Sequence, residues 1–181
     1  MKYMLKVPKD EFKHITEQEY QKLLMNTTDI QKRLILELMW TYGLRISEVL
    51  QLTKDDIIST PDGYNIRIKR LKKKKDRVTI LPLKFDLGLE LQRYILHFDI
   101  KDKLFKITRQ AIWSWLKNLS LQVLNKKIHP HAFRHGRVYD LIKKRANWME
   151  IVKLLDWEDP RLLLRYFHPT QEDLRNLIEK T

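Results

Sequence analysis

The sequence predicts a mainly helical domain with a small antiparallel β-sheet, an α+β fold. Helix signals recur along most of the 181-residue chain, as capping residues followed by apolar residues at helical spacing. Two short β-branched stretches, residues 63–71 and 76–83, alternate in part and predict a hairpin. No Pro- or Gly-rich linker and no internal repeat interrupts the chain, so a single domain is expected.

The first part of the chain predicts a basic arm and three helices. Residues 1–14 form the arm, and Thr16 then begins a helix with a capping box. Residues 29–42 are apolar on nearly all sides after the first turn, which is typical of a buried helix. We expect Gly43 to end this helix in the left-handed conformation. Residues 44–52 are typical of a further short helix.

The second part of the chain predicts the hairpin and then more helices. Four consecutive lysines, residues 72–75, lie between the two strands and are expected at the tip of the hairpin. Helices are predicted at 87–98, 108–119, 128–141, 147–155, 159–167 and 170–180. The last three follow the capping residues Asn147, Asp159 and Thr170.

The composition limits the function classes. A net charge of +13 and a pI of about 9.8 favour a polyanionic partner, most plausibly nucleic acid. The absence of cysteine excludes disulfides and thiolate zinc sites. The sequence has no apolar run of about 18 residues that could span a membrane and no glycine-rich phosphate loop.

Residues 128–141, "IHPHAFRHGRVYDL", gather histidines and arginines where a helix is predicted to begin. His131 and Arg134 are three residues apart, so their side chains share one face of that helix. A helix N-terminus favours anions, and a guanidinium offers a planar set of donors to phosphate oxygens. The stretch is therefore either one wall of a phosphate pocket or a solvated basic face. His129 and His135 flank the pair and leave open which histidine does the work.

Arg45 and Tyr166 are the other candidates. Arg45 follows the helix-ending Gly43, where a charged side chain needs a partner, and Glu48 could pair with it. Tyr166 follows an arginine in "LLLRYFHP" on a short predicted helix. Taken alone, each residue would more often be structural, as an ion pair and as a tyrosine packed on the core.

In combination, these pieces resemble the tyrosine recombinases, the phage-integrase-type site-specific recombinases. The resemblance rests on "TYGLRISEVLQL", the lysine hairpin "KRLKKKKDR", "HAFRH", "LLDW" and "RYFHP", in that order. Tyr166 lies nine residues after Trp157, as expected in this family. The resemblance covers residues 15–169 and implies the catalytic-domain architecture of the family.

The resemblance implies a role for each matching residue. Tyr166 would attack a DNA phosphodiester and form a 3′-phosphotyrosyl link, which allows rejoining without ATP, metal or cofactor. Arg45 and Arg134 would stabilise the charge on the phosphate, and Trp157 would donate a hydrogen bond to it. His131 would act as general base, because a phenol has a pKa of about 10, or as a donor that orients the phosphate.

The hairpin would supply the proton for the leaving 5′-oxygen. We favour Lys72 as this general acid, with Lys73 close behind; Lys73, Lys74, Lys75 and Arg77 are otherwise expected to contact DNA. Glu48 would orient Arg45. The family's common Leu-Gly before the histidine-or-tryptophan position is Leu155 and Asp156 here, so a different helix geometry is expected near Trp157.

The implied partner is double-stranded DNA, with self-association as a tetramer on two duplexes and a monomer when free. Residues 170–181 would dock on a neighbouring subunit or fold back in cis. Most relatives also carry an N-terminal helical domain that clamps the DNA, and a catalytic domain without it should bind weakly. A cytoplasmic, nucleoid-associated protein of prokaryotic, plasmid or viral origin is expected. A type IB-like topoisomerase and a catalytically silent DNA-binding module are the alternatives.

Overall fold

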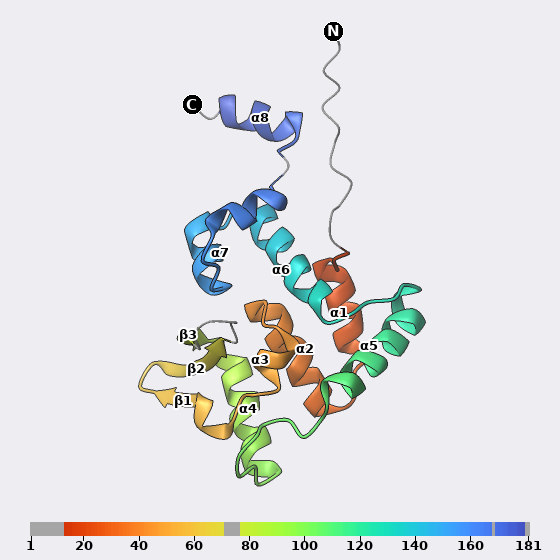
Figure 1. Cartoon of the computed structure of the whole chain (residues 1–181), viewed down its shortest axis with the longest axis vertical. Helices are drawn as coiled ribbons and strands as arrows, with labels where there is room; N and C mark the ends of the chain where they lie inside the picture. The colour runs from red at the N-terminus through yellow and green to blue at the C-terminus, as the bar shows by residue number, and fades with distance from the viewer. Residues whose placement is uncertain (1–12, 71–76, 168, 180–181) are drawn as a thin grey trace.

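The computed structural model describes residues 13–70, 77–167 and 169–179, and it confirms the predicted fold class. Most of these residues lie in α-helices, and the strands form one antiparallel sheet (Figure 1). The α-helices are α1 (Glu17–Met25), α2 (Ile30–Tyr42), α3 (Ile46–Val49), α4 (Phe85–His97), α5 (Arg109–Leu124), α6 (His131–Lys143), α7 (Trp148–Leu154) and α8 (Gln171–Ile178). Two 3₁₀ helices, η1 (Lys54–Asp56) and η2 (Pro160–Arg165), complete the helical part.

The sheet has the strand order β1-β2-β3, with β1 at Ile57–Thr60, β2 at Gly63–Arg70 and β3 at Arg77–Leu83. The predicted hairpin is β2 and β3, whose register pairs Arg70 with Arg77 at the end of the ladder that adjoins the connecting residues 71–76. The predicted lysine tip, residues 72–75, lies outside the described residues. The sequence analysis missed β1, because four residues directly after a 3₁₀ turn are too few to show an alternating pattern.

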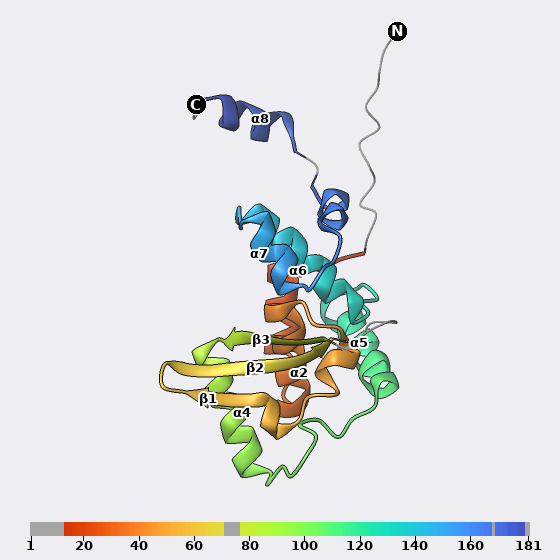
Figure 2. The ribbon, with the colours of Figure 1, turned by 60° about the vertical axis from the view of Figure 1, so that its left-hand side comes forward.

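Helix α2 runs through the centre of the domain. Seven of its thirteen residues are buried, including Leu34, Leu38 and Met39, which confirms the expected buried helix. Helices α1, α4 and α6 pack around α2, and α4 also packs against β1 and β2 (Figures 1 and 2). The central helix therefore has helices on several sides and fixes the loop that follows its C-terminal end.

Gly43 ends α2 in the left-handed conformation, with a φ of 59°, as predicted. A Cβ atom at this position would lie 2.5 Å from Cδ2 of Leu155, so a larger residue would collide with the end of α7. The glycine thus allows two segments far apart in sequence to meet. Arg45 leaves the same turn two residues later, and its position depends on this close approach.

The C-terminal part differs from the prediction in one respect. Residues 159–167 were expected to form an α-helix, but Pro160–Arg165 form the 3₁₀ helix η2, with i to i+3 bonds such as that from the Tyr166 amide to the Leu163 carbonyl (2.9 Å). Asp159 caps η2 as predicted, accepting a hydrogen bond from the Arg161 amide. At three residues per turn, the six residues of η2 make about two turns.

Helix α8 stands apart from the other helices in both views (Figures 1 and 2). Its exposed apolar residues include Leu174, at 41%, and Ile178, at 73%. No helix within the described ranges is long and apolar enough to cross a membrane.

Candidate active site

One cavity of about 200 Å³ collects the predicted catalytic residues except Lys72, which lies outside the described residues. Its lining consists of Arg45, His131, Arg134, His135, Trp157, Leu162, Arg165 and Tyr166. These residues come from four places in the chain: the turn after α2, the first turns of α6, the segment after α7, and η2 with the residue that ends it. Segments more than 100 residues apart in sequence thus converge on one small space.

The first cationic group of the cavity is Arg45, which Glu48 holds in place. Nη1 of Arg45 donates a hydrogen bond of 2.9 Å to Oε1 of Glu48, and the Arg45 amide donates one of 2.9 Å to Oε2. The Glu48 side chain is fully buried, whereas the Arg45 side chain is 36% exposed. The carboxylate therefore fixes the arginine from the protein side and leaves its other donors available to the cavity.

The second cationic group is Arg134, which is 3% exposed. Its Nη1 donates to the carbonyl of Gly43 and its Nη2 to the carbonyl of Leu155, both at 2.8 Å. These bonds use two of the five donors of a guanidinium and fix its plane. Burial, with the nearby charge of Arg45, lowers the pKa of Arg134 to about 10, so it stays charged at neutral pH.

Two histidines of α6 line the cavity. The rings of His131 and His135 meet edge to face, with 4.5 Å between their centroids. Burial, followed by the charges of His131 and Arg134, lowers the pKa of His135 to about 4. The pKa of His131 is also lowered, by desolvation and then by Arg134 and Arg45. Burial, with the neighbouring positive charges, therefore favours neutral imidazoles, which can accept a proton.

Tyr166 is 7% exposed, and its hydroxyl reaches His135. The hydroxyl oxygen lies 2.6 Å from Nδ1 of His135. The ring of Trp157 stacks on that of Tyr166, with 5.7 Å between centroids and 25° between planes, and Tyr139 meets it edge-on at 5.2 Å. Two aromatic rings and a histidine thus hold the phenol in the cavity.

Trp157 is placed by the end of α7. Asp156 adopts a φ of 50°, the left-handed conformation, and the Trp157 amide donates to the Val152 carbonyl at 3.0 Å. The Asp156 amide donates to the Lys153 carbonyl at 3.2 Å, which completes a Schellman motif. An aspartate thus occupies the backbone conformation that favours glycine, where the family commonly has glycine. Trp157 also lies near Arg134, whose guanidinium carbon is 5.8 Å from the indole centroid.

The hairpin residues are not part of this lining as described. Lys72, Lys73, Lys74 and Lys75 lie outside the described residues, so their roles stay predictions. Arg77 begins β3 and pairs with Glu158 at 3.1 Å, with both side chains at least half exposed. This ion pair joins the start of β3 to the segment that follows Trp157.

Sequence reasoning missed three contributors to the site. His135 was treated as a neighbour of the candidate pair, yet it is the histidine that contacts Tyr166. Arg165 lines the cavity beside the tyrosine. Arg70 is fully buried next to Glu48, and the pattern of β2 carried the signal: Ile66 and Ile68 alternate with polar residues, and Arg70 continues their inward-facing row.

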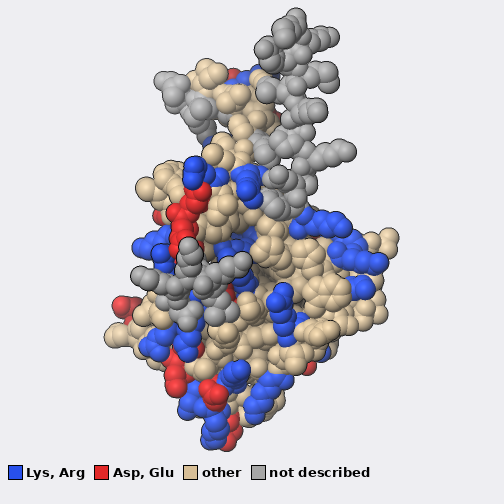
Figure 3. Space-filling view, in the orientation of Figure 1, with Lys and Arg blue, Asp and Glu red and all other residues tan. Residues whose placement is uncertain are grey.

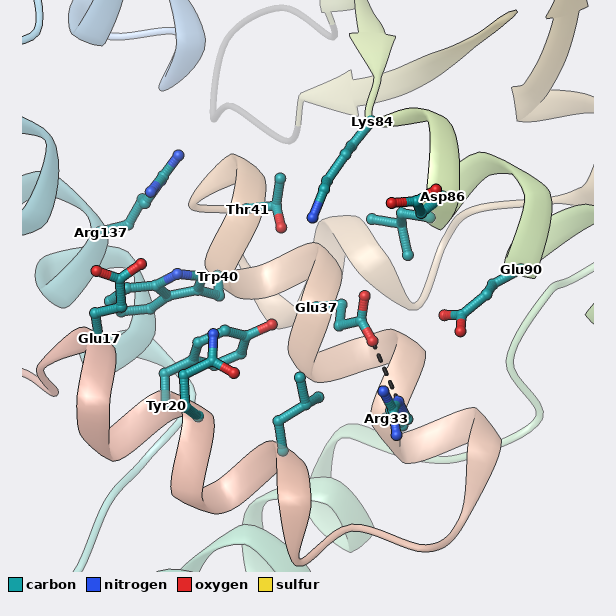
Figure 4. Close-up of a pocket in the computed structure, with 13 residues that line it drawn as sticks. Glu17, Tyr20, Arg33, Glu37, Trp40, Thr41, Lys84, Asp86, Glu90 and Arg137 are labelled. Atoms are coloured by element: carbon teal, nitrogen blue, oxygen red, sulfur yellow. Dashed lines mark hydrogen bonds and ion pairs between the residues drawn. The ribbon is translucent and has the colours of Figure 1, made fainter.

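A second, larger cleft of about 430 Å³ lies among α1, α2, α4 and α6 (Figure 4). It shares no lining residue with the first cavity. Several of its charged residues pair with others: Arg33 with Glu37 at 3.3 Å, Glu17 with Lys144 at 2.9 Å and Arg137 with Asp140 at 2.7 Å. The predicted site residues that the structure describes therefore do not meet here.

Basic side chains are distributed over one face of the domain. In Figure 3, lysine and arginine are spread over the visible face, and acidic side chains gather mainly toward its left edge. Within the described ranges, no group of three or more histidine or acidic side chains is placed to hold a metal ion.

Comparison with known proteins places the chain in a family. The model of the phage integrase family matches residues 13–173. The chain belongs to the phage integrase family. Among similar members, tyrosine recombinase XerA of Saccharolobus solfataricus is 29% identical over 171 residues, which are 94% of this chain and 57% of the relative. XerA of Thermococcus kodakarensis is 30% identical over 185 residues, 97% of this chain and 64% of the relative. This phage integrase family member thus spans less than two thirds of the length of these relatives.

Solved structures support the same fold. XerH site-specific recombinase bound to its difH substrate matches with a TM-score of 0.74 at 20% identity, over 98% of this chain and 57% of that one. The catalytic domain of bacteriophage HP1 integrase matches with a TM-score of 0.71 at 18% identity, over 93% and 95% of the two chains. The fold of this family member is therefore that of a tyrosine recombinase catalytic domain.

Proposed function

We propose that this protein is a site-specific DNA recombinase that cleaves and rejoins strands through a 3′-phosphotyrosyl intermediate. The observation that supports the proposal is the convergence of Arg45, His131, Arg134, Trp157 and Tyr166 on one cavity. A phosphodiester placed there would meet the guanidiniums of Arg45 and Arg134, an indole N–H and a phenol. Membership of the phage integrase family supports the same reaction class.

Tyr166 would be the nucleophile. Its oxygen would bond to the scissile phosphorus while the bond from phosphorus to the 5′-oxygen breaks, and the 5′-oxygen would take up a proton. We keep Lys72 as the donor of that proton, with Lys73 as the next candidate. The number of phosphoester bonds is unchanged, so the reverse attack by a 5′-hydroxyl can rejoin strands without ATP.

Arg45 and Arg134 would stabilise the negative charge that develops on the non-bridging oxygens, as fixed cations do in phosphoryl transfer. Both are held before a substrate arrives, by Glu48 and by two backbone carbonyls. Trp157 would add a neutral N–H donor. Preorganised donors of this kind need little rearrangement at the moment of reaction.

The two histidines would divide the remaining work. His135 shares a short hydrogen bond with the Tyr166 hydroxyl and is neutral at physiological pH, so it is placed to take the phenol proton. His131 lines the same cavity and is exposed to solvent, and it would orient the phosphate or take the proton in a second arrangement. This assignment extends the sequence hypothesis, which gave the role of general base to His131.

The partner would be double-stranded DNA, to which the net charge of +13 is suited. Neutralising about six phosphates would make the logarithm of affinity fall with the logarithm of salt concentration with a slope of about −5. The exposed apolar residues of α8 would dock on a neighbouring subunit, so that tetramers form on two duplexes. Such an enzyme would act in the cytoplasm, at the nucleoid.

The decisive experiment is trapping of the covalent intermediate. The protein is incubated with a nicked suicide site, and a protein–DNA adduct is sought on a denaturing gel. Wild type should form the adduct, and Tyr166→Phe should form none. Equal adduct with Tyr166→Phe would refute the assignment, and absence of adduct with sequence-specific binding would favour a silent DNA-binding module. Relaxation of supercoiled DNA at any sequence without strand exchange would favour a type IB-like topoisomerase.

A further inference from the structure

Arg70 is a fully buried arginine at the end of β2. Its Nη2 donates a hydrogen bond of 2.8 Å to the carbonyl of Leu154, and its Nη1 lies 3.4 Å from Oε2 of Glu48. Both side chains of this ion pair are 0% exposed. A guanidinium without contact to water is costly to bury, and its partners therefore need an explanation.

Each partner of Arg70 either bonds to a proposed catalytic residue or is the sequence neighbour of a residue that does. Glu48 holds Arg45 through two hydrogen bonds of 2.9 Å. Leu154 precedes Leu155, whose carbonyl accepts the hydrogen bond from Arg134. Arg70 thus contacts Glu48, which holds Arg45, and the residue next to Leu155, which holds Arg134.

Stability alone explains this arrangement poorly. Replacing a buried ion pair by packed apolar residues is often neutral or stabilising. An apolar residue would continue the buried row of Ile66 and Ile68 on the same strand. The charge of Arg70 also works against that of the nearby Arg45. A group with these costs is better explained by what it holds in place.

We propose that Arg70 is a positioning residue that, through Glu48 and the end of α7, fixes Arg45 and Arg134 on the scissile phosphate. The proposal rests on the proposed recombinase function. With Arg70 in place, the Glu48 carboxylate accepts hydrogen bonds from both Arg45 and Arg70, so it cannot rotate away from Arg45. Without Arg70, Glu48 loses one of its two cationic partners, and the Leu154 carbonyl loses a donor.

The chemistry of the substrate separates positioning from a general structural role. In a methylphosphonate, a neutral methyl group replaces one non-bridging oxygen of the scissile linkage. Less negative charge develops in the reaction, so the demand for a well-placed guanidinium falls. A variant in which Arg45 or Arg134 is misplaced should therefore regain activity on the methylphosphonate. A poorly folded variant should stay slow on both the phosphate and the methylphosphonate.

Rates of adduct formation should be measured on phosphate and methylphosphonate sites for Arg70→Met, Arg70→Lys and Arg45→Ala. We expect Arg45→Ala to lose about 10²- to 10³-fold on the phosphate and to recover most of that loss on the methylphosphonate. Arg70→Met should lower the rate of adduct formation on the phosphate about 10- to 100-fold, the range in which supporting residues act. On the methylphosphonate, most of this loss should be recovered. Arg70→Lys, which keeps the charge but cannot bridge both partners, should fall between Arg70→Met and wild type.

The control is Arg67→Met, which removes an arginine three residues earlier in β2 whose partner is Asp56, at 3.9 Å. It should leave the ratio of the two rates unchanged. If Arg45→Ala recovers but the Arg70 variants are equally slow on both substrates, the inference is overturned. If Arg45→Ala itself fails to recover, the proposed role of Arg45 falls instead. Circular dichroism and thermal melting monitor folding; if neither Arg70 variant folds, Arg70 is a structural residue and the inference fails.

Discussion

The hydroxyl oxygen of Tyr166 and Nδ1 of His135 lie 2.6 Å apart inside the domain. The tyrosine is thus docked in the same cavity as the arginines of its own chain. A neutral imidazole at this distance can accept the phenol proton when its own proton is on Nε2. The contact makes His135, as well as His131, a candidate for general base.

His135→Ala should slow adduct formation by about 10²-fold or more, the usual size of a general-base contribution. The matched control is His129→Ala, which removes a histidine from the same stretch that does not line the cavity. Single-turnover rates on a suicide site measure the effect. A wild-type rate for His135→Ala would return the role of base to His131.

The stability of the protein should fall as the pH is lowered from about 6.5 toward 4. The pKa of His135 is about 4 in the folded state, below the value of about 6.5 for an unperturbed histidine. Between these values the unfolded chain binds more protons, so acid favours unfolding, by about 1.4 kcal/mol for each unit of pKa difference. Urea denaturation at several pH values should show that the free energy of unfolding changes more steeply with pH in wild type than in His135→Gln. Equal slopes would contradict the prediction.

Arg134→Lys should impair both stability and activity. An ammonium group cannot reach the Gly43 and Leu155 carbonyls at once in the planar geometry of a guanidinium. A buried carbonyl left without a donor costs about 1–3 kcal/mol, and loss of a charge-stabilising donor costs about 10²- to 10³-fold in rate. Arg137→Lys, one turn along α6 and paired with Asp140, is the control and should stay close to wild type in rate.

Gly43→Ala should lower the melting temperature. A left-handed conformation costs an L-residue about 1–2 kcal/mol, and the added Cβ would also meet Cδ2 of Leu155 at 2.5 Å. Thermal unfolding of Gly43→Ala, Leu155→Ala and the double variant forms a double-mutant cycle. The loss in the free energy of unfolding should be smaller for the double variant than the sum of the losses for the two single variants, because truncating Leu155 removes the collision. Strict additivity would show that the collision is relieved in another way.

Charges on the apolar face of α8 should block assembly and spare cleavage. Leu174→Glu with Ile178→Glu places two carboxylates where α8 exposes apolar side chains. Glu172→Lys, on the opposite side of this helix, is the control. Sedimentation of protein–DNA complexes should show tetramers for wild type and the control but smaller complexes for the double variant, with adduct formation retained. Tetramers of the double variant would exclude this docking surface.

The elements that the sequence predicted correctly are those with strong signals in neighbouring residues. The Thr16 capping box, the buried helix α2 and the left-handed Gly43 are set by residues within one turn of each other, and the structure confirms them. Strand β1 depends on its pairing with β2, such as that of Ile57 with Ile66, and η2 is only six residues long. Short segments carry too little periodicity for such effects to be seen.

The same division holds for the site. The spacing of His131 and Arg134 on a helix start indicated a shared direction, and both residues line the cavity. The contact of His135 with Tyr166 joins positions 31 residues apart, and the contact of Arg70 with Glu48 joins positions 22 residues apart. Neither separation belongs to a helix or strand period, so only the packed structure brings these pairs together.

The two acceptors of Arg134 are backbone carbonyls, and carbonyls are neutral. They orient the guanidinium without cancelling its charge, as a carboxylate in their place would do. A phosphodiester bound in this cavity, as proposed, would meet a guanidinium that is not hydrogen-bonded to a carboxylate. Under the proposed function, these main-chain anchors would leave the attraction of Arg134 for a DNA phosphate undiminished, in contrast to Arg45, which is held by the Glu48 carboxylate.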